Sequence, residues 1–236
     1  MQPDWNPAVP QPGAQAVAVD TSAQHRVLRN TYWLLALTMI PTVIGAMAGA
    51  SFQFGAIFKL YPIMAPLGMF FIMLGLLFGV SAARNSVWGV VLMFAFTFVA
   101  GFFLGPILQH AFALRNGGQL VALSGGMTGA ILFAMAGIAT VTKKDFSFMG
   151  KFLFIGLVLL VVASLANLFF QIPALQLTLS AISVLIFSAY ILYDVSNIIH
   201  GGQTNYVMAT VNLYLDIYNI FVSLLNLLMA FSGQRD

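Results

Sequence analysis

The chain has 236 residues, of which 61% are hydrophobic and only 6% are charged, and its mean hydropathy is +0.96. A water-soluble domain of this composition would expose large apolar patches, so the composition excludes a soluble globular protein and indicates a membrane protein. The formal net charge of +3 comes from nine basic and six acidic residues. The basic residues are scattered over predicted loops, which is typical of membrane topology and not of a nucleic-acid-binding surface.

The first 25 residues are predicted to form a disordered cytoplasmic tail. They contain four prolines within the first twelve residues, and they lack both the basic start and the apolar run of a signal peptide. Residues 26–236 are predicted to form a single membrane domain, because no duplicated halves and no soluble domain are visible in the sequence.

Charges and turn residues divide the remainder into seven apolar segments. About 20 residues suffice for a helix to cross a hydrocarbon core of about 30 Å, and each segment has that length. The predicted fold class is therefore an all-α integral membrane protein, a bundle of seven transmembrane helices. The segments cover residues 31–51, 61–83, 86–109, 119–140, 150–171, 174–199 and 206–231.

Orientation follows from the lysines and arginines on alternate sides of these segments, because cytoplasmic loops carry the excess of positive charge. Six of the nine basic residues lie on the side of the N-terminus and three on the other side, which predicts a cytoplasmic N-terminus. The six are Arg26, Arg29, Arg84, Lys143, Lys144 and Lys151, and the three are Lys59, Arg115 and Arg235.

Each of the first four segments contains two glycines four residues apart, a spacing that lets helix backbones approach closely. The alternative is that glycine is simply frequent in membrane helices. Pro106, which follows Gly105, is expected to kink or end the third helix because it removes a backbone donor and clashes with the preceding turn. The four pairs are Gly45/Gly49, Gly75/Gly79, Gly101/Gly105 and Gly125/Gly129.

Polar residues recur at helical spacing in the last two segments. The sixth segment carries Ser180, Ser183, Phe187, Tyr190, Asp194 and Asn197, and the seventh carries Asn212, Asp216, Asn219, Ser223 and Asn226. The connection between them, residues 200–205, is short and polar, so we expect antiparallel neighbours whose stripes face each other.

Asp194 and Asp216 are the candidate functional residues, because an acidic side chain inside a membrane helix is costly and usually marks a proton or ion pathway. If the two carboxyl groups approach, they cannot both ionise cheaply and would share a proton. We expect this pair to form a pH-sensing gate, supported by Asn197, Asn212 and Asn219. Arg84, at a depth close to that of Asp194, is an alternative partner for an ionised carboxylate.

Carboxylates and amide carbonyls are also oxygen ligands that Ca²⁺ accepts, so the sequence allows transient calcium at Asp194 and Asp216 but no resident metal. The alternative is that each aspartate is protonated and simply holds helices together. No hydrolase or metalloprotease motif occurs, and the chain has no cysteine. We therefore expect no enzyme and no cofactor.

The same residues resemble the Bax inhibitor-1 family, also called the transmembrane Bax inhibitor motif family. The resemblance is strongest over Tyr190-Ile-Leu-Tyr-Asp194-Val-Ser-Asn-Ile-Ile-His-Gly-Gly202 and Asn205-Tyr-Val-Met-Ala-Thr-Val-Asn-Leu-Tyr-Leu-Asp216-Ile-Tyr-Asn219. Four further stretches, 27–32, 105–108, 143–150 and 166–175, are similar to the bacterial YccA-type branch, and the resemblance covers about residues 26–232.

The resemblance implies a seven-helix fold with a two-aspartate pH sensor, here Asp194 and Asp216 with Arg84 as their arginine partner, and a pH-dependent calcium leak. The YccA-type branch implies a different role, an inner-membrane protein that binds and restrains the membrane ATP-dependent protease FtsH. Two hypotheses therefore stand together: a modulator of FtsH, and a calcium leak channel gated by the aspartate pair.

Overall fold

The computed structural model describes residues 21–142 and 144–233. Over these residues the chain is helical and contains no strand. The elements are α1 (Thr21–Ser51), α2 (Phe54–Leu60), α3 (Met64–Ala83), α4 (Val87–Phe103), α5 (Gly105–Phe112), α6 (Gly117–Thr142), the 3₁₀ turn η1 (Ser147–Met149), α7 (Gly150–Phe170), α8 (Pro173–Ile199) and α9 (Tyr206–Gly233).

Seven stretches of the described chain are long and apolar enough to cross a membrane, and they coincide with the seven predicted segments. The third stretch, Val87–Phe112, is made of two helices, α4 and α5. These helices separate at Leu104, directly before Gly105 and Pro106, so the predicted interruption at Pro106 is confirmed. The seven-helix fold class is confirmed, and the cytoplasmic side of the N-terminus stays a prediction.

α1 begins earlier than predicted. Residues 21–25, the end of the segment that we expected to be a tail, belong to this helix, and the rest of that segment lies outside the described residues.

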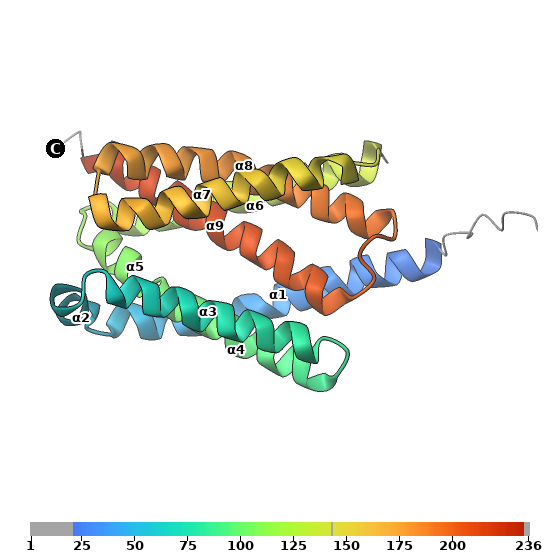
Figure 1. Cartoon of the computed structure of the whole chain (residues 1–236), viewed down its shortest axis with the longest axis horizontal. Coiled ribbons are helices and arrows are strands. Elements are labelled where there is room, and N and C mark those ends of the chain that lie inside the picture. The colour runs from blue at the N-terminus through green and yellow to red at the C-terminus, as the bar shows by residue number, and fades with distance from the viewer. Residues whose placement is uncertain (1–20, 143, 234–236) are drawn as a thin grey trace, which may run out of the picture.

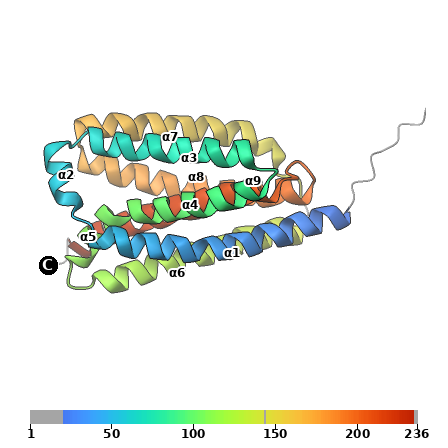
Figure 2. The ribbon, with the colours of Figure 1, turned by 90° about the horizontal axis from the view of Figure 1, so that it is seen from below.

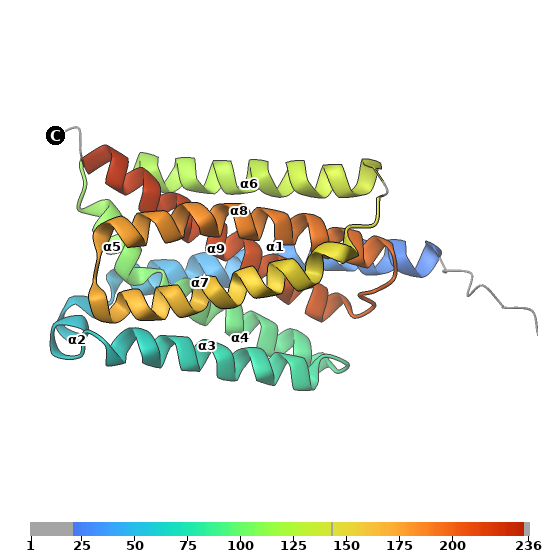
Figure 3. The same cartoon turned by 45° about the horizontal axis from the view of Figure 1, so that its top comes forward.

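The helices form a bundle in which α9 runs obliquely through the middle (Figures 1 and 3). α1 packs along α4, α3 packs on the same α4, and α8 packs along α9. α2 lies across one end of the bundle (Figure 2). The core is centred on α9 and its neighbours, where Tyr214, Phe96, Met93 and Ile191 are almost completely buried.

Two of the four glycine pairs make the expected close approach, and both lie at the crossing of α1 with α4 and α5. A Cβ atom on Gly45 or Gly49 would lie 2.1 Å from a backbone carbonyl oxygen of α4, and one on Gly101 would lie 2.1 Å from the carbonyl oxygen of Thr42. These positions need glycine because no side chain fits. By contrast, Gly75, Gly125 and Gly129 face open space, and Gly79 faces only the Leu92 side chain of α4 at an ordinary contact distance of 3.7 Å, so neither of these pairs brings two helix backbones together.

A glutamine side chain closes the end of α1. The last carbonyl groups of a helix lack partners within that helix and need donors from elsewhere. The Nε2 amide of Gln109, on α5, donates hydrogen bonds to the carbonyl oxygens of Gly49, Ala50 and Phe52. This cap fixes α5 against the end of α1.

Candidate functional site

The polar stripes of α8 and α9 face each other, as predicted. The two helices are antiparallel neighbours with one of the largest contact surfaces in the molecule. Residues 200–205 reverse the chain between them, and Gly201 has a φ angle of 79°, a left-handed conformation that favours glycine. The buried polar residues of the stripes are Ser180, Ser183 and Asp194 on α8 and Asp216 and Ser223 on α9.

The two aspartates meet inside the bundle. The side chain of Asp194 is 6% exposed and that of Asp216 is 4% exposed, and their carboxyl groups are hydrogen-bonded to each other. The side chain of Asn212, one turn before Asp216 on α9, also hydrogen-bonds to Asp194. The sequence left open whether the two acids meet, because they lie at different distances from the ends of their helices; in the structure they interact. α9 runs obliquely to its neighbours (Figure 1).

This contact requires a proton. Two carboxylates are both acceptors, so one of them must be protonated to donate to the other. Asp194 has two hydrogen-bonding neighbours, Asp216 and Asn212, whereas the Oδ2 atom of Asp216 is buried without any partner. A buried carboxylate oxygen without a donor is strongly disfavoured, so the pair as a whole holds at least one proton.

The Tyr190 ring lies one turn before Asp194 on α8 and interacts electrostatically with both acids. Its hydroxyl is a third titratable group close to the pair. The arrangement is therefore an acid pair with one amide and one phenol, which can hold and release a proton.

Two of the predicted supporting asparagines point to their own backbone or turn instead. The Asn219 Nδ2 amide donates to the carbonyl oxygen of Leu215, one turn earlier. Asn197 stands at the end of α8, where its carbonyl oxygen accepts the N–H groups of Gly202 and Gln203. Of the three predicted asparagines, the structure brings only Asn212 to the acids.

The structure does not bring Arg84 to the acids. The Arg84 side chain is exposed at the end of α3, and no ion pair within residues 21–142 and 144–233 includes it. The physical reason is that α3 packs on α4, away from α8. Only the Arg84 backbone participates in contacts with the α8–α9 connection, because its carbonyl oxygen accepts a hydrogen bond of 3.1 Å from Asn205 Nδ2.

A family model described as "Inhibitor of apoptosis-promoting Bax1" matches residues 24–233, almost the whole membrane domain. The chain belongs to the Bax inhibitor-1 family. It is 42% identical over 207 residues to the "Modulator of FtsH protease YccA" of Escherichia coli strain K12, an alignment that covers 86% of this chain and 90% of that relative.

Two other bacterial proteins are similar to this chain over most of their length. "Inner membrane protein YccA" of Escherichia coli O6:H1 shows the same 42% identity over 207 residues. A membrane protein of Vibrio cholerae serotype O1 is 39% identical over 208 residues, covering 88% of this chain and 91% of that relative. This Bax inhibitor-1 family member is thus a multi-pass protein of the bacterial inner membrane.

The sequence analysis missed a second polar contact, on the other face of α9. The Tyr214 hydroxyl lies 3.0 Å from Thr42 Oγ1 on α1 and donates to the Thr97 carbonyl oxygen on α4 at 3.3 Å. Thr42 Oγ1 also lies 2.8 Å from the Thr38 carbonyl oxygen, so the two hydroxyl protons of Thr42 and Tyr214 serve three contacts between oxygens. Tyr214 therefore joins three helices two residues before Asp216. The only indication of this contact in the sequence was that Tyr214 is a polar residue on the face of α9 opposite the predicted polar stripe.

In this Bax inhibitor-1 family member, Ser196, two residues after Asp194, holds a loop that the sequence did not predict. The Ser196 hydroxyl accepts the Phe146 N–H at 3.0 Å and donates to the Lys144 carbonyl oxygen at 3.3 Å. In the same loop, hydrogen bonds from the side chain and the backbone N–H of Ser147 hold the pKa of Asp145 below its ordinary value, with a further small effect of His200. The loop before α7 is therefore attached to the end of α8 that carries the acid pair.

No three histidine, cysteine or acidic side chains gather in the described part of the chain. The pair and Asn212 supply fewer oxygens than the six to eight that a resident Ca²⁺ takes. The arrangement suits a proton, or an ion that passes with its water, better than a bound metal.

Proposed function

We propose that this protein is an inner-membrane modulator of the FtsH protease, acting by binding and without catalysis of its own. The observation that carries the proposal is the 42% identity to the Escherichia coli protein named for this role, over 90% of its length. Because the alignment covers nearly all of both chains, the proposal extends to the whole membrane domain and not to one motif.

The contacts between loops support a binding role. On the side of the α8–α9 connection, Asn205 joins that connection to the Arg84 carbonyl oxygen and to Asn85 Oδ1 at 2.8 Å. On the same side, Ser196 holds the loop before α7. The α3–α4 turn and the α8–α9 connection are thereby joined, and the loop before α7 is fixed to the end of α8. These contacts present a defined surface to a membrane protein partner.

Co-purification tests the proposal. A tagged form of the chain is isolated in mild detergent from bacterial membranes that contain FtsH, and bound FtsH is measured by immunoblot. We expect FtsH with the full chain and less of it when residues 2–20 are deleted, a deletion that leaves α1 intact. Absence of FtsH from the full chain, while an equally abundant known FtsH partner retains it, would contradict the proposal.

A second candidate function is a pH-sensitive calcium leak through the membrane, with Ca²⁺ as the transported ion. The observation that favours it is the buried hydrogen bond between Asp194 and Asp216. While one proton is shared, this bond holds α8 to α9. When the proton leaves, the two negative charges repel each other in a low-dielectric site, which favours separation of the helices.

Calcium flux into vesicles tests this second function. The protein is reconstituted, and flux is measured across pH for the unchanged chain and for Asp216→Asn. We expect flux that varies with pH in the unchanged chain and loses that variation in the variant. Absence of flux in both would leave the acid pair as a structural link between helices.

A further inference from the structure

We propose that a groove between α1 and α6 binds one acyl chain of an anionic phospholipid, with the phosphate held near Arg115. The groove is a hollow of about 1030 Å³ lined by residues from 32–50 of α1, 104–112 of the α4–α5 break and α5, 121–140 of α6 and 214–221 of α9. The inference is independent of the FtsH and calcium proposals, because it uses the opposite face of α9 from the acid pair.

The packing of the helices creates the groove. α1 packs against α4, α5, α8 and α9, and α6 packs against α5, α8 and α9, so the two helices stand apart over a floor made by α9. Figure 3 shows α6 along one edge of the bundle. On the α6 side, Gly125, Gly129 and Gly137 have no side chain to fill the groove. A Cβ atom at any of them would meet nothing within 4 Å.

The lining suits hydrocarbon. Most of the lining side chains are aliphatic or aromatic. The threonine hydroxyls are already used within their own helices: Thr42 donates to Thr38, Thr128 to Ser124 and Thr140 to Ala136. A polar occupant would find few groups to bind, and an apolar occupant leaves the hydrogen bonds of these threonines intact.

The length of the groove suits hydrocarbon. Tyr32 and Ala50, both on α1, are 18 residues apart, about 27 Å along a helix, which is close to the thickness of the hydrocarbon core. An acyl chain that enters at the end near Phe112 therefore has apolar surroundings over its whole length.

The charge at one end of the groove favours an anionic headgroup. Arg115 is exposed in the connection between α5 and α6, three residues after Phe112, which lines the groove. The three aspartates within the described residues lie elsewhere, Asp194 and Asp216 in the pair and Asp145 on the opposite side of the bundle. Since no described carboxylate competes for the guanidinium, a phosphate is its natural partner.

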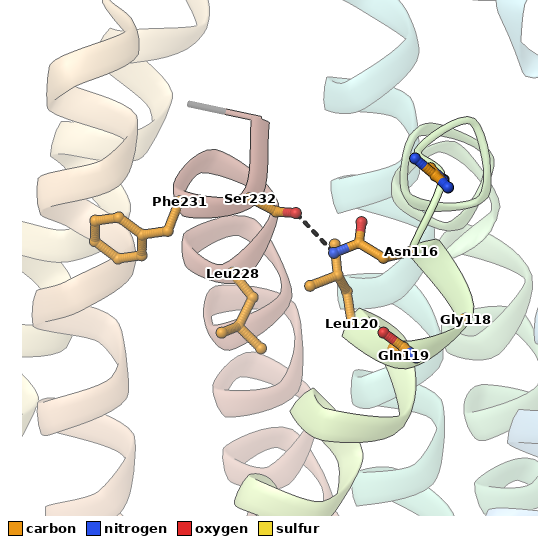
Figure 4. Close-up of a pocket in the computed structure, with 8 residues that line it drawn as sticks. Asn116, Gly118, Gln119, Leu120, Leu228, Phe231 and Ser232 are labelled. Atoms are coloured by element: carbon orange, nitrogen blue, oxygen red, sulfur yellow. Dashed lines mark hydrogen bonds between the residues drawn. The ribbon is translucent and has the colours of Figure 1, made fainter. Parts of the chain in front are cut away.

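A second hollow, of about 820 Å³, adjoins this end and provides polar surroundings for a headgroup. It is lined by Arg115, Asn116, Gln119 and Ser232, together with apolar residues of α6 and α9. Figure 4 shows Asn116 held in place by its 2.8 Å hydrogen bond to Ser232, with Gln119 one turn into α6. An amide, a hydroxyl and a cation at the membrane boundary are suitable donors for a phosphate and glycerol group.

Photo-crosslinking in vesicles tests the inference. The full chain is reconstituted in phosphatidylethanolamine with a minor share of phosphatidylglycerol whose acyl chain carries a diazirine, and labelled peptides are identified by mass spectrometry. We expect labels on α1 and α6 that Gly129→Leu removes, because leucine fills the groove. The matched control is Gly75→Leu. Its new side chain also enters open space, but Gly75 lies on α3, outside the groove, so labelling of α1 and α6 should be unchanged.

Two further variants complete the test. Gly125→Leu should repeat the loss of labels if Gly129→Leu proves poorly folded. Arg115→Gln should lower labelling by the phosphatidylglycerol probe but not by a phosphatidylethanolamine probe with the same diazirine. Labelling of α3 as strong as that of α1 and α6, labels that persist in both leucine variants, or crosslinks from the groove to a second protein helix would each overturn the inference.

Discussion

Asp194 on α8 and Asp216 on α9 are hydrogen-bonded through their carboxyl groups in the interior of a seven-helix membrane protein. One oxygen of Asp216 has no partner, whereas Asp194 is also bonded to Asn212. The two acids therefore differ in their contacts, and the pair shares at least one proton because two carboxylates are both acceptors.

Asp194→Asn should therefore disturb the site more than Asp216→Asn. An amide at 216 still meets its one partner, Asp194, whereas an amide at 194 keeps only one acceptor oxygen for its two partners, Asp216 and Asn212. We expect Asp194→Asn to lower thermal stability in detergent by about 1–3 kcal/mol, the cost of leaving buried groups unpaired, and Asp216→Asn to lower it less. Equal losses in thermal unfolding would refute this difference between the two acids.

Gly101→Ala should be strongly destabilising. The new methyl group would lie 2.1 Å from the Thr42 carbonyl oxygen, so the backbones of α1 and α4 must separate. Overpacking of this kind costs about 1–3 kcal/mol and sometimes more. Thermal unfolding in detergent measures the loss, and Gly75→Ala, whose methyl group enters open space, is the control that should stay close to the unchanged protein.

Tyr214→Phe should weaken the junction of α1, α4 and α9. The ring remains, but the hydroxyl contacts with Thr42 and the Thr97 carbonyl oxygen are lost. Hydrogen bonds between membrane helices contribute about 0.6 kcal/mol on average and up to about 1.7 kcal/mol. A double-mutant cycle with Thr42→Val should recover a coupling energy in that range, and additive effects would show that the hydroxyls do not interact.

Gln109→Leu should loosen the end of α1. The substitution removes the amide donor of the Ala50 carbonyl oxygen, whereas the Gly49 carbonyl oxygen keeps the Phe52 N–H. The loss is about 1–3 kcal/mol where the site is buried. Hydrogen exchange at residues 46–54 should become faster. The same change at Gln119, whose side chain is exposed on α6, is the matched control and should leave exchange in that segment unchanged.

The loop before α7 should respond to acid through Asp145. Its pKa is held below the ordinary value by Ser147, so its contribution to loop stability is present above the ordinary pKa of an aspartate, about 3.9. That contribution is lost as pH falls through the lowered pKa. Asp145→Asn should therefore speed hydrogen exchange at residues 144–149 at neutral pH. The difference from the unchanged chain should vanish in strong acid, and a difference that persists there would show another cause.

The length of the hydrophobic segments predicted the seven spans, and Pro106 predicted the break in the third span. The polar stripes predicted that α8 and α9 face each other. These features depend on which residues stand close together along the chain, which can be read directly from the sequence. The contact between Asp194 and Asp216 needed the tilt of α9, which is set by packing against several helices at once. The exposed position of Arg84 follows in the same way from the packing of α3 on α4.

Glycine spacing illustrates the same limit. Gly45/Gly49 and Gly125/Gly129 have the same motif, yet only the first pair touches another helix of this chain. The motif shows where a close approach is allowed, and the neighbouring helix decides whether it occurs. Tyr214 was missed for a similar reason, because one hydroxyl without a pattern gives no sign of the three helices that it joins.

The most direct test of the proposed role measures proteolysis by FtsH itself. Purified FtsH is reconstituted in vesicles with ATP and a membrane protein substrate, and degradation is followed while increasing amounts of this chain, or of an unrelated multi-pass membrane protein, are included. The account predicts that degradation slows with increasing amounts of this chain, reaches a plateau, and is unaffected by the unrelated protein. A degradation rate that stays constant with this chain in excess over FtsH would contradict it.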